Sequence, residues 1–341
     1  MRVEDYTYEL PDNLIADTPP EQRGASRLLV LDRKTGATVD SWYRNVADYL
    51  NEGDVLVIND TKVIKARLKA LKQNGAEREL IVLEKHGNDT DWYRHTVMYR
   101  RRLTVGDTLK VGEANLRVLK IQGDGIALIE SDKDLLELTE KYGTVPLPPY
   151  MHRDATSLDV ERYQTVWANH QGSVAAPTAS LNMTESILDS LRQKGVKVAY
   201  LTLHVGLGTF LPIRVDRLED HHMHQEYFEI PQETVEVIQQ AKKSGHRVIA
   251  LGTTVTRTLE YAADKLLEDP QPLRGEADIF MYPGYTFKAI DGLLTNYHAP
   301  KSTVLMLTAA FAGWDNLKRA YDHAVAEKYA FLSYGDSMLI K

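Results

Sequence analysis

Short runs of alternating hydrophobic and polar residues dominate the first 150 positions of this 341-residue chain. The clearest run is residues 64–70, where apolar residues alternate with Lys and Arg. This period of two predicts a strand with one buried face and one basic face. Further short strands are predicted at close spacing, separated by turns containing Gly or Asp: residues 80–83, 93–98, 108–111, 115–121 and 125–129. Together they predict a small all-β unit of the barrel type.

Beyond residue 150, predicted helices alternate with predicted strands. An amphipathic helix is expected at residues 184–194 and further helices at residues 233–243 and 303–312, with strands at residues 196–205, 248–251 and 293–295. Before the predicted barrel, the apolar residues 55–58 predict another strand. Such alternation predicts βαβ units and a mostly parallel sheet. The proline-rich residues 146–150 mark a domain boundary. We therefore predict an α/β domain, with a mostly parallel sheet, formed by residues 1–61 and 151–341. Residues 62–150 are expected to form an inserted β-barrel-like domain.

Composition narrows the class of protein. The chain has no cysteine, which excludes disulfides, thiolate zinc sites, catalytic thiols and cysteine-bound iron–sulfur clusters. It shows neither an apolar run of eighteen residues nor the apolar core of a signal peptide, so we expect no membrane span and a cytoplasmic location. Net charge is −7, yet residues 62–110 hold twelve Lys and Arg against six Asp and Glu. This basic segment fits either local contact with a polyanion or an ordinary solvated surface.

Three predicted strand-to-helix loops carry glycine and hydroxyl residues: residues 203–210, 251–257 and 295–302. Each alone fits an ordinary turn or helix cap. In a parallel sheet, however, all three would lie at the carboxyl ends of strands, where α/β proteins bind ligands. The loop at residues 251–257 also predicts an anion site, because free N–H groups gather at the start of a helix. The small-residue loop 173–180 would likewise permit close approach to the backbone.

Two further segments have competing interpretations. Residues 221–226, with three histidines, could bind a metal, but no further ligands occur at recognisable spacing. A general base from His224 or Glu226 is favoured over a metal ligand, and ordinary surface or hydrogen-bonding histidines stay an open alternative. The aromatic residues 280–288 fit either hairpin packing or a platform for a stacked base or a sulfonium cation.

Taken together, these strings resemble one family, the S-adenosylmethionine:tRNA ribosyltransferase-isomerases of queuosine synthesis. The resemblance spans the whole chain. It is carried by the motifs at residues 22–28, 59–63, 146–150, 163–166, 173–179, 202–210, 221–226, 252–254, 282–285, 295–302 and 333–336.

The resemblance implies an unusual reaction. Such enzymes transfer the ribosyl group of S-adenosylmethionine to the aminomethyl group of a 7-deazaguanine at the anticodon wobble position. They release adenine and methionine and rearrange the transferred ring to an epoxycyclopentanediol. The resemblance therefore implies S-adenosylmethionine as co-substrate, no prosthetic group and no metal. The expected partner is a tRNA with a GUN anticodon, and we expect a monomer.

Setting that reaction against the residues gives candidate roles. A histidine suits removal of the proton next to the sulfonium, so the catalytic candidates are His224 and Glu226, followed by His204 and His298. The helix start at residues 252–254 suits the methionine carboxylate, and tyrosine faces suit the sulfonium. The substrate-binding candidates are Thr178, Asn182, Gly206, Gly208, Thr209, Gly252, Thr253, Thr254, Tyr282, Tyr285, Asn296 and Lys301. The tRNA-binding candidates are Lys65, Arg67, Lys69, Arg100, Arg101 and Arg102.

The chain departs from the family pattern at two places. Asn182 and Met183 stand where the family has His and Phe, and residues 97–101 differ from its Lys-Pro-x-Lys-Arg string. Two alternatives therefore stay open: a paralogue acting on another nucleoside or RNA, and a catalytically silent tRNA-binding protein. A conventional methyltransferase is disfavoured, because residues 59–61 replace the Gly-rich loop expected after its first strand.

Overall fold

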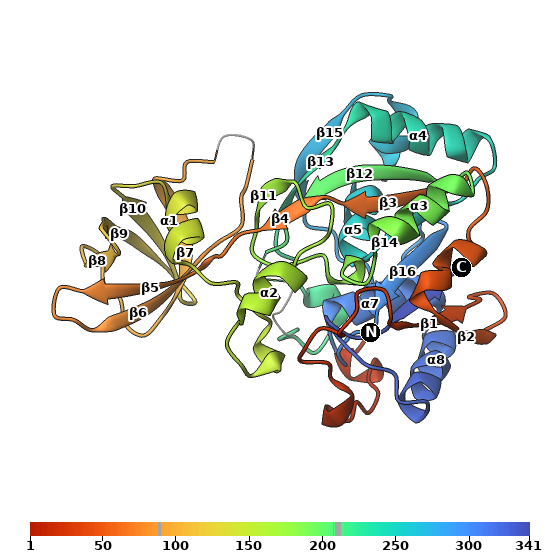
Figure 1. The fold of residues 1–341 in the computed structure, drawn as a ribbon, viewed down its shortest axis with the longest axis horizontal. Coiled ribbons are helices and arrows are strands. Elements are labelled where there is room, and N and C mark those ends of the chain that lie inside the picture. The colour runs from red at the N-terminus through yellow and green to blue at the C-terminus, as the bar shows by residue number, and fades with distance from the viewer. Residues whose placement is uncertain (88–89, 207, 209–212) are drawn as a thin grey trace.

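The computed structural model describes residues 1–87, 90–206, 208 and 213–341. Within these ranges, the larger body is a nine-stranded sheet with helices on both faces, and the smaller body is a closed six-stranded barrel (Figure 1). The N-terminal strands and the C-terminal strand both lie in the larger body. The α/β class and the barrel predicted from the sequence are thus confirmed.

The large sheet is parallel at its centre and antiparallel towards its margins. The four central strands, β12, β3, β14 and β16, are all parallel to one another. Antiparallel strands extend this core on both sides, and β1 joins β17 in parallel. Across the sheet the strands are β15 (Leu273–Ala277), β13 (Glu226–Ile230), β12 (Lys197–Leu203), β3 (Val55–Asn59), β14 (Val248–Leu251), β16 (Gly292–Asn296), β17 (Ser337–Ile340), β1 (Arg27–Leu31) and β2 (Thr38–Trp42).

Helices bury both faces of this sheet, which explains why its central strands are apolar throughout. In β3, Val55 and Val57 pack into one hydrophobic cluster, whereas Leu56 and Ile58 pack into the other. The first cluster includes side chains of α4 (Gln232–Lys243), α5 (Thr253–Tyr261), α6 (Ala263–Glu268), α7 (Thr303–Ala312) and α8 (Trp314–Ala326). The second includes α3 (Glu185–Gln193) and the 3-10 segment η3 (Tyr43–Tyr49).

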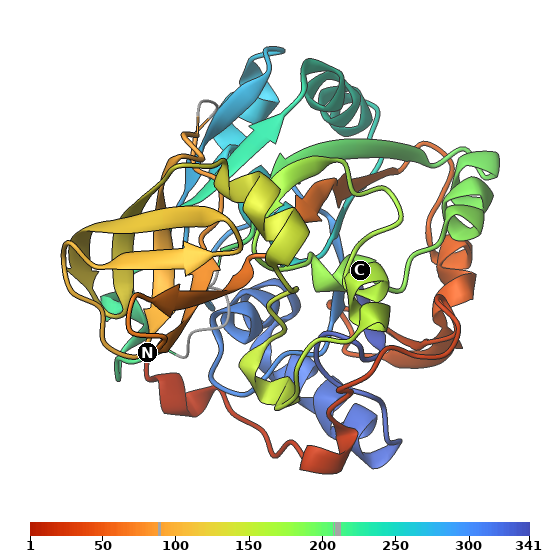
Figure 2. The same cartoon turned by 60° about the vertical axis from the view of Figure 1, so that its left-hand side comes forward.

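The barrel forms because alternate residues of its strands point inward. In β5, Leu68 and Ala70 are buried while Lys69 is exposed, as the period of two predicts. Figure 2 turns this closed barrel towards the viewer. Its order is β10 (Ile126–Ser131), β7 (Arg94–Arg100), β6 (Glu77–Val82), β5 (Arg67–Lys72), β8 (Thr108–Val111) and β9 (Ala114–Gly123), and α1 (Leu135–Tyr142) packs against β5.

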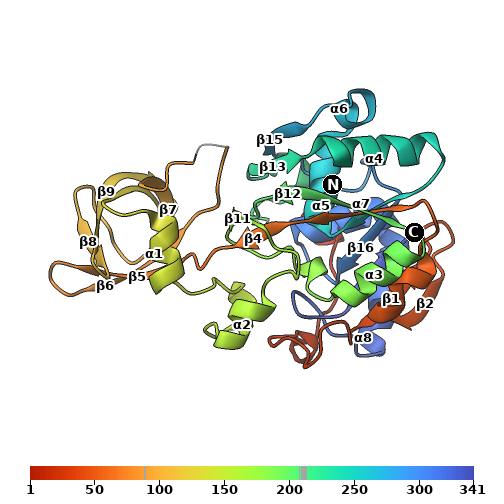
Figure 3. The ribbon, with the colours of Figure 1, turned by 45° about the horizontal axis from the view of Figure 1, so that its top comes forward.

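Extended chain joins the two bodies (Figure 3). It leaves the sheet through β4 (Thr61–Val63), which pairs with β11 (His170–Ser173). It returns through the 3-10 turn η4 (Pro149–Met151) and α2 (Ser157–Arg162). The barrel strands fall inside residues 62–150, and the domain boundaries themselves stay a prediction. In the part of the chain that the structure describes, we find no helix with the length and apolarity that crossing a membrane requires.

Candidate active site

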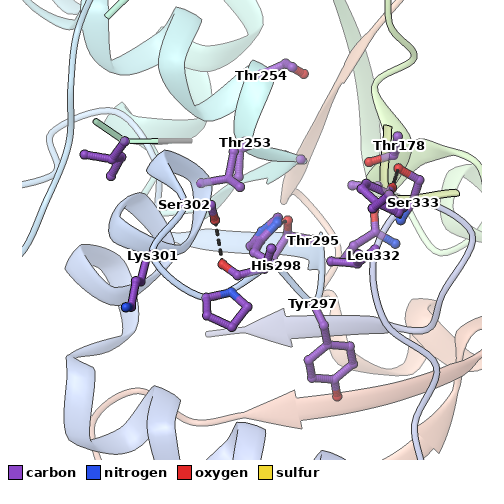
Figure 4. Close-up of a pocket in the computed structure, with 18 of the residues that line it drawn as sticks. Thr178, Thr253, Thr254, Thr295, Tyr297, His298, Lys301, Ser302, Leu332 and Ser333 are labelled. Atoms are coloured by element: carbon purple, nitrogen blue, oxygen red, sulfur yellow. Dashed lines mark hydrogen bonds between the residues drawn. The ribbon is translucent and has the colours of Figure 1, made fainter. Parts of the chain in front are cut away.

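A cavity of about 630 Å³ lies at the carboxyl ends of β14 and β16 (Figure 4). Residues 252–254 follow β14, and residues 295–302 end β16 and lead into α7. Five other segments complete the wall: residues 3–4, 149–150, 176–179, 213–216 and 332–333. Two of the three predicted loops, and part of the small-residue loop, therefore meet at one site. From the loop at residues 203–210, the described lining includes Val205.

Two helices begin at this cavity. Gly252 precedes α5 with a φ of 93°, a left-handed conformation that favours glycine, and among the described residues no side chain caps this helix start. The first N–H groups of α5 are therefore available to an anion, and the helix dipole adds to the attraction. Ser302 precedes α7; its hydroxyl accepts from the Leu305 N–H at 3.2 Å and donates to the Ala299 carbonyl at 2.7 Å.

His298 presents a neutral imidazole in the same cavity. Its Nε2 lies 3.0 Å from Oγ1 of Thr295. Two tyrosines fix its backbone: the Tyr321 hydroxyl accepts from its N–H at 3.0 Å, and the Tyr8 hydroxyl donates to its carbonyl at 2.5 Å. Burial lowers the pKa of His298 to about 3, so the ring is uncharged at physiological pH. An uncharged imidazole is the form that can accept a proton, and a pKa this low makes it a weaker base than a solvated histidine.

The other candidate bases lie outside the described lining of the cavity. Glu226 forms a buried ion pair with Arg257, and its Oε1 accepts from the Gly206 N–H at 2.9 Å. It thus ties the Gly206 loop to α5. The exposed His224 packs its ring against Gly208. His224 precedes β13, and Glu226 is the first residue of that strand. The catalytic roles of His224 and Glu226 stay predictions.

His204 is buried beneath the point where the barrel joins the sheet. Its Nδ1 lies 2.8 Å from the hydroxyl of Thr61, and its ring stacks on Tyr227 with centroids 6.2 Å apart. Burial, with a smaller contribution from the nearby Lys85 charge, lowers the pKa of His204 to about 3. The described cavity lining does not include this residue.

The predicted substrate-binding residues divide into two groups. Those in the cavity wall are Thr178, Gly252, Thr253, Thr254, Asn296 and Lys301. Lys301 lies at the rim, where its Nζ is 2.8 Å from the Glu4 carboxylate. Thr209 lies outside the described residues.

The remaining candidates have partners within the fold. Gly206 packs against the Glu84 carboxylate so closely that a Cβ there would overlap it. Tyr285 donates to Glu260 at 3.2 Å, and Tyr282 packs on Phe280 with centroids 5.2 Å apart. Residues 280–288 contain one turn, at residues 283–284, and no strand, so the hairpin interpretation of this segment is wrong.

Asn182 is also held inside the fold. Its Nδ2 donates to the Gly335 carbonyl at 2.9 Å and to Oγ of Ser337 at 3.2 Å, and its Oδ1 accepts from the Ser26 hydroxyl at 2.7 Å. Its side chain therefore fixes the turn before β17, and the described lining of the cavity does not include it.

The predicted tRNA-binding cations lie on and beside the barrel, and they differ in how closely carboxylates of the fold pair with them. Lys65 pairs with Glu140 at 2.7 Å, while Arg67 and Arg100 lie 4.0 and 3.4 Å from Glu79. The more available cations are Lys69, Arg101 and Arg102, all exposed. Arg101 has a φ of 66°, which turns the chain just after β7.

Sequence reasoning gave no role to several residues that shape the site. Arg257, Tyr150 and Ser333 are examples: Arg257 fixes Glu226, and the other two line the cavity. The family-like motifs at residues 146–150 and 333–336 contained two of them, but a pattern in sequence does not show which side chain faces a cavity.

Comparison with known proteins identifies the family. The family model described as "Queuosine biosynthesis protein" matches residues 3–340. A relative from Pelodictyon phaeoclathratiforme, named S-adenosylmethionine:tRNA ribosyltransferase-isomerase, is 55% identical over 344 residues, covering 100% of both chains. A relative from Francisella tularensis subsp. mediasiatica with the same name is 45% identical over 341 residues, again covering 100% of both. The crystal structure of S-adenosylmethionine tRNA ribosyltransferase from Thermotoga maritima has a TM-score of 0.58 and 33% identity, covering 99% of this chain and 100% of that one.

These similarities and the cavity at the sheet edge define an enzyme of the transferase and isomerase class. The chain belongs to the queuosine biosynthesis protein family. Among the described residues, no group of three or more His, Asp or Glu side chains is arranged to hold a metal ion.

Proposed function

We propose that this enzyme transfers the ribosyl group of S-adenosylmethionine to 7-aminomethyl-7-deazaguanine in a tRNA anticodon. The ring is isomerised to give epoxyqueuosine, and adenine and methionine are released. The observation that carries the proposal is the cavity of about 630 Å³, which combines an anion-binding helix start, a neutral imidazole and several hydroxyls. Its volume lies within the ~300–1,000 Å³ range of small-molecule sites. The names of full-length relatives point to the same chemistry.

His298 is the proton acceptor in this proposal. Of the four candidate bases, it is the one in the described cavity lining. A sulfonium acidifies the neighbouring C–H, and a neutral imidazole held in place by Thr295 can remove that proton. The Tyr8 and Tyr321 contacts fix the backbone at His298, so the ring approaches the substrate from a defined direction.

The methionine carboxylate binds at the start of α5. Thr253 and Thr254 supply hydroxyls beside the uncapped N–H groups, and both line the cavity. The positive end of the helix dipole stabilises the carboxylate there. Lys301 at the rim adds a positive charge, although its ion pair with Glu4 reduces the charge available to a ligand.

The barrel supplies tRNA contacts in this proposal, through Lys69, Arg101 and Arg102. The nucleotide to be modified leaves its stack to reach the cavity, which costs least in a loop such as the anticodon. A tRNA with a GUN anticodon, a monomeric protein and a cytoplasmic location complete the proposal.

The test is to incubate the protein with S-adenosylmethionine and tRNA bearing the 7-aminomethyl-7-deazaguanine precursor. We expect adenine and methionine in equal amounts, together with epoxyqueuosine in the tRNA. Release of adenine with a different modified base would indicate a paralogue with another substrate. Binding of tRNA without any release of adenine would indicate the silent tRNA-binding protein.

A further inference from the structure

Tyr150 and Ser333 meet in the cavity wall from distant parts of the chain. Figure 4 labels Ser333 in this wall. Tyr150 lies in η4, where the chain returns from the barrel, and Ser333 lies in the turn before β17. Their hydroxyls form a short hydrogen bond, and the Ser333 N–H donates to the Tyr150 oxygen at 3.1 Å. The proposed function gives neither hydroxyl a task.

Either oxygen could donate in the bond between the hydroxyls, and their relative acidity sets the direction. The Tyr150 oxygen already accepts from the Ser333 N–H. Burial raises the pKa of Tyr150 to about 12, so the phenol keeps its proton at neutral pH. The phenol is the more acidic of the two hydroxyls and therefore the better donor, whereas a bond from Ser333 to Tyr150 would make the Tyr150 oxygen accept twice. If Tyr150 donates to Ser333, the Ser333 proton is left to point into the cavity.

The turn that carries Ser333 is held in an unfavourable conformation. Leu332 has a φ of 69°, in the left-handed region that side chains other than glycine rarely adopt. The Asp336 carboxylate stabilises the turn by accepting from the N–H groups of Arg27 at 2.6 Å and Ala330 at 2.7 Å. Asn182 adds its bond to the Gly335 carbonyl. Backbone strain maintained at a cavity wall is typical of a functional turn.

We propose that Ser333 binds substrate by donating its hydroxyl proton to a ribose hydroxyl oxygen of S-adenosylmethionine, and that Tyr150 is its positioning residue. This inference rests on the proposed function. The charged side chains of the described lining, Glu4, Arg214, Asp216 and Lys301, come from three other segments. Ser333 and Tyr150, like Thr178 in the same lining, offer uncharged hydroxyls, which suit a neutral sugar oxygen.

The experiment measures binding of S-adenosylmethionine by calorimetry, with precursor-free tRNA present and absent, to the unaltered protein and to Ser333→Ala and Tyr150→Phe. We expect Kd to rise about tenfold for Ser333→Ala, the usual scale for one lost hydrogen bond. Tyr150→Phe should raise it several-fold, because the serine hydroxyl then loses its orientation. Tyr43→Phe is the matched control. Its hydroxyl is buried on the other face of the sheet and has no partner among the described residues.

The 2′-deoxy and 3′-deoxy analogues of S-adenosylmethionine identify the contact. With the analogue that lacks the contacted oxygen, Ser333→Ala should bind as well as the unaltered protein. An undiminished penalty with both analogues, or unchanged Kd in both variants, overturns the inference. If the unaltered protein neither binds S-adenosylmethionine nor releases adenine, the proposed function itself fails. The melting temperature of each variant shows whether it is folded. If Ser333→Ala is unfolded, the Kd values of Tyr150→Phe for S-adenosylmethionine and the two analogues provide the test.

Discussion

His86 Nδ1 lies 2.9 Å from Oε2 of Glu276, which joins the segment after barrel strand β6 to strand β15 of the large sheet. The other ring nitrogen, Nε2, lies 3.7 Å from Oε1 of Glu84. The Glu84 carboxylate in turn packs against Gly206. A short chain of contacts therefore connects the barrel to a loop beside the candidate active site.

The ion pair between His86 and Glu276 should weaken as the pH rises through about 9. Glu84 first, and then Glu276, raise the pKa of His86 from 6.5 to about 9. A raised pKa in the folded protein means that the stabilisation is fully present below about pH 6.5 and is lost as pH rises through about 9. We expect Glu276→Gln to lower the melting temperature at pH 6.5. The difference from the unaltered protein should become smaller as the pH is raised to 10. A constant difference across that range would contradict the charged link.

His298→Ala should slow single-turnover adenine release by about 10²–10⁴-fold, because a general base typically contributes that much. His204→Ala is the matched control, since both histidines are uncharged and paired with a threonine hydroxyl. We expect His204→Ala to change the rate less than tenfold. A large loss in the control together with a small loss in His298→Ala would assign the base to His204, outside the described cavity lining.

The rate of adenine release should not decline between pH 8 and pH 5 through titration of His298. Burial keeps the pKa of this residue at about 3, so its imidazole stays uncharged over the whole range. The measurement is the single-turnover rate as a function of pH. A decline of this rate with a midpoint near pH 6.5, absent in His298→Gln, would contradict the prediction. It would show that the imidazole of His298 is more solvated than its place in the cavity indicates.

Replacing Arg101 and Arg102 together by Ala should weaken tRNA binding and reduce its salt dependence. Each lost phosphate contact should reduce the log–log slope by roughly one unit. The double variant Lys318→Ala with Arg319→Ala removes equal charge from α8, distant from the barrel strands, and should leave the slope unchanged. Equal slopes in both double variants would mean that the barrel arginines are only a solvated surface.

The unaltered protein should release adenine although Asn182 stands where the family has histidine. The Asn182 side chain bonds to Ser26, Gly335 and Ser337, so it supports a turn and does not carry a proton. Asn182→His should therefore add no activity and should lower the melting temperature, because a larger ring overfills a buried site. Activity in Asn182→His alone would reverse this interpretation and favour the silent or altered-substrate alternative.

The fold was largely predictable because burial follows periodicity. Residues 64–70 were predicted as a strand, and β5 begins only at Arg67, because the Ala66 N–H bonds to the Ile64 carbonyl in a tight turn. Ile64 and Ala66 are nevertheless buried, as the pattern indicates. Strand direction was less predictable. β13, β15 and β17 run antiparallel to their neighbours β12, β13 and β16, respectively. These directions depend on connections across the sheet, which hydrophobic patterning does not record.

The cavity loops were predictable where glycine and hydroxyl residues follow a strand directly, as at Gly252 and Thr253. Contacts between distant residues were not. Glu226 was proposed as a base, but the sequence gives no sign that Arg257 pairs with it. The Tyr150–Ser333 contact likewise joins residues 183 positions apart.

The position of β17 has a consequence for how the chain folds during synthesis. β1 pairs in parallel with β17, so that Leu28 lies opposite Ser337. A ribosome must therefore synthesise the chain past residue 337 before β1 gains this neighbour, and the turn carrying Ser333 forms at the same late stage. The strands of the barrel all lie between Arg67 and Ser131, so they can pair with one another before β17 is synthesised. Such long-range pairing slows folding and leaves partly paired strands exposed to aggregation. Truncation near the C-terminus should thus spare the barrel and abolish the cavity.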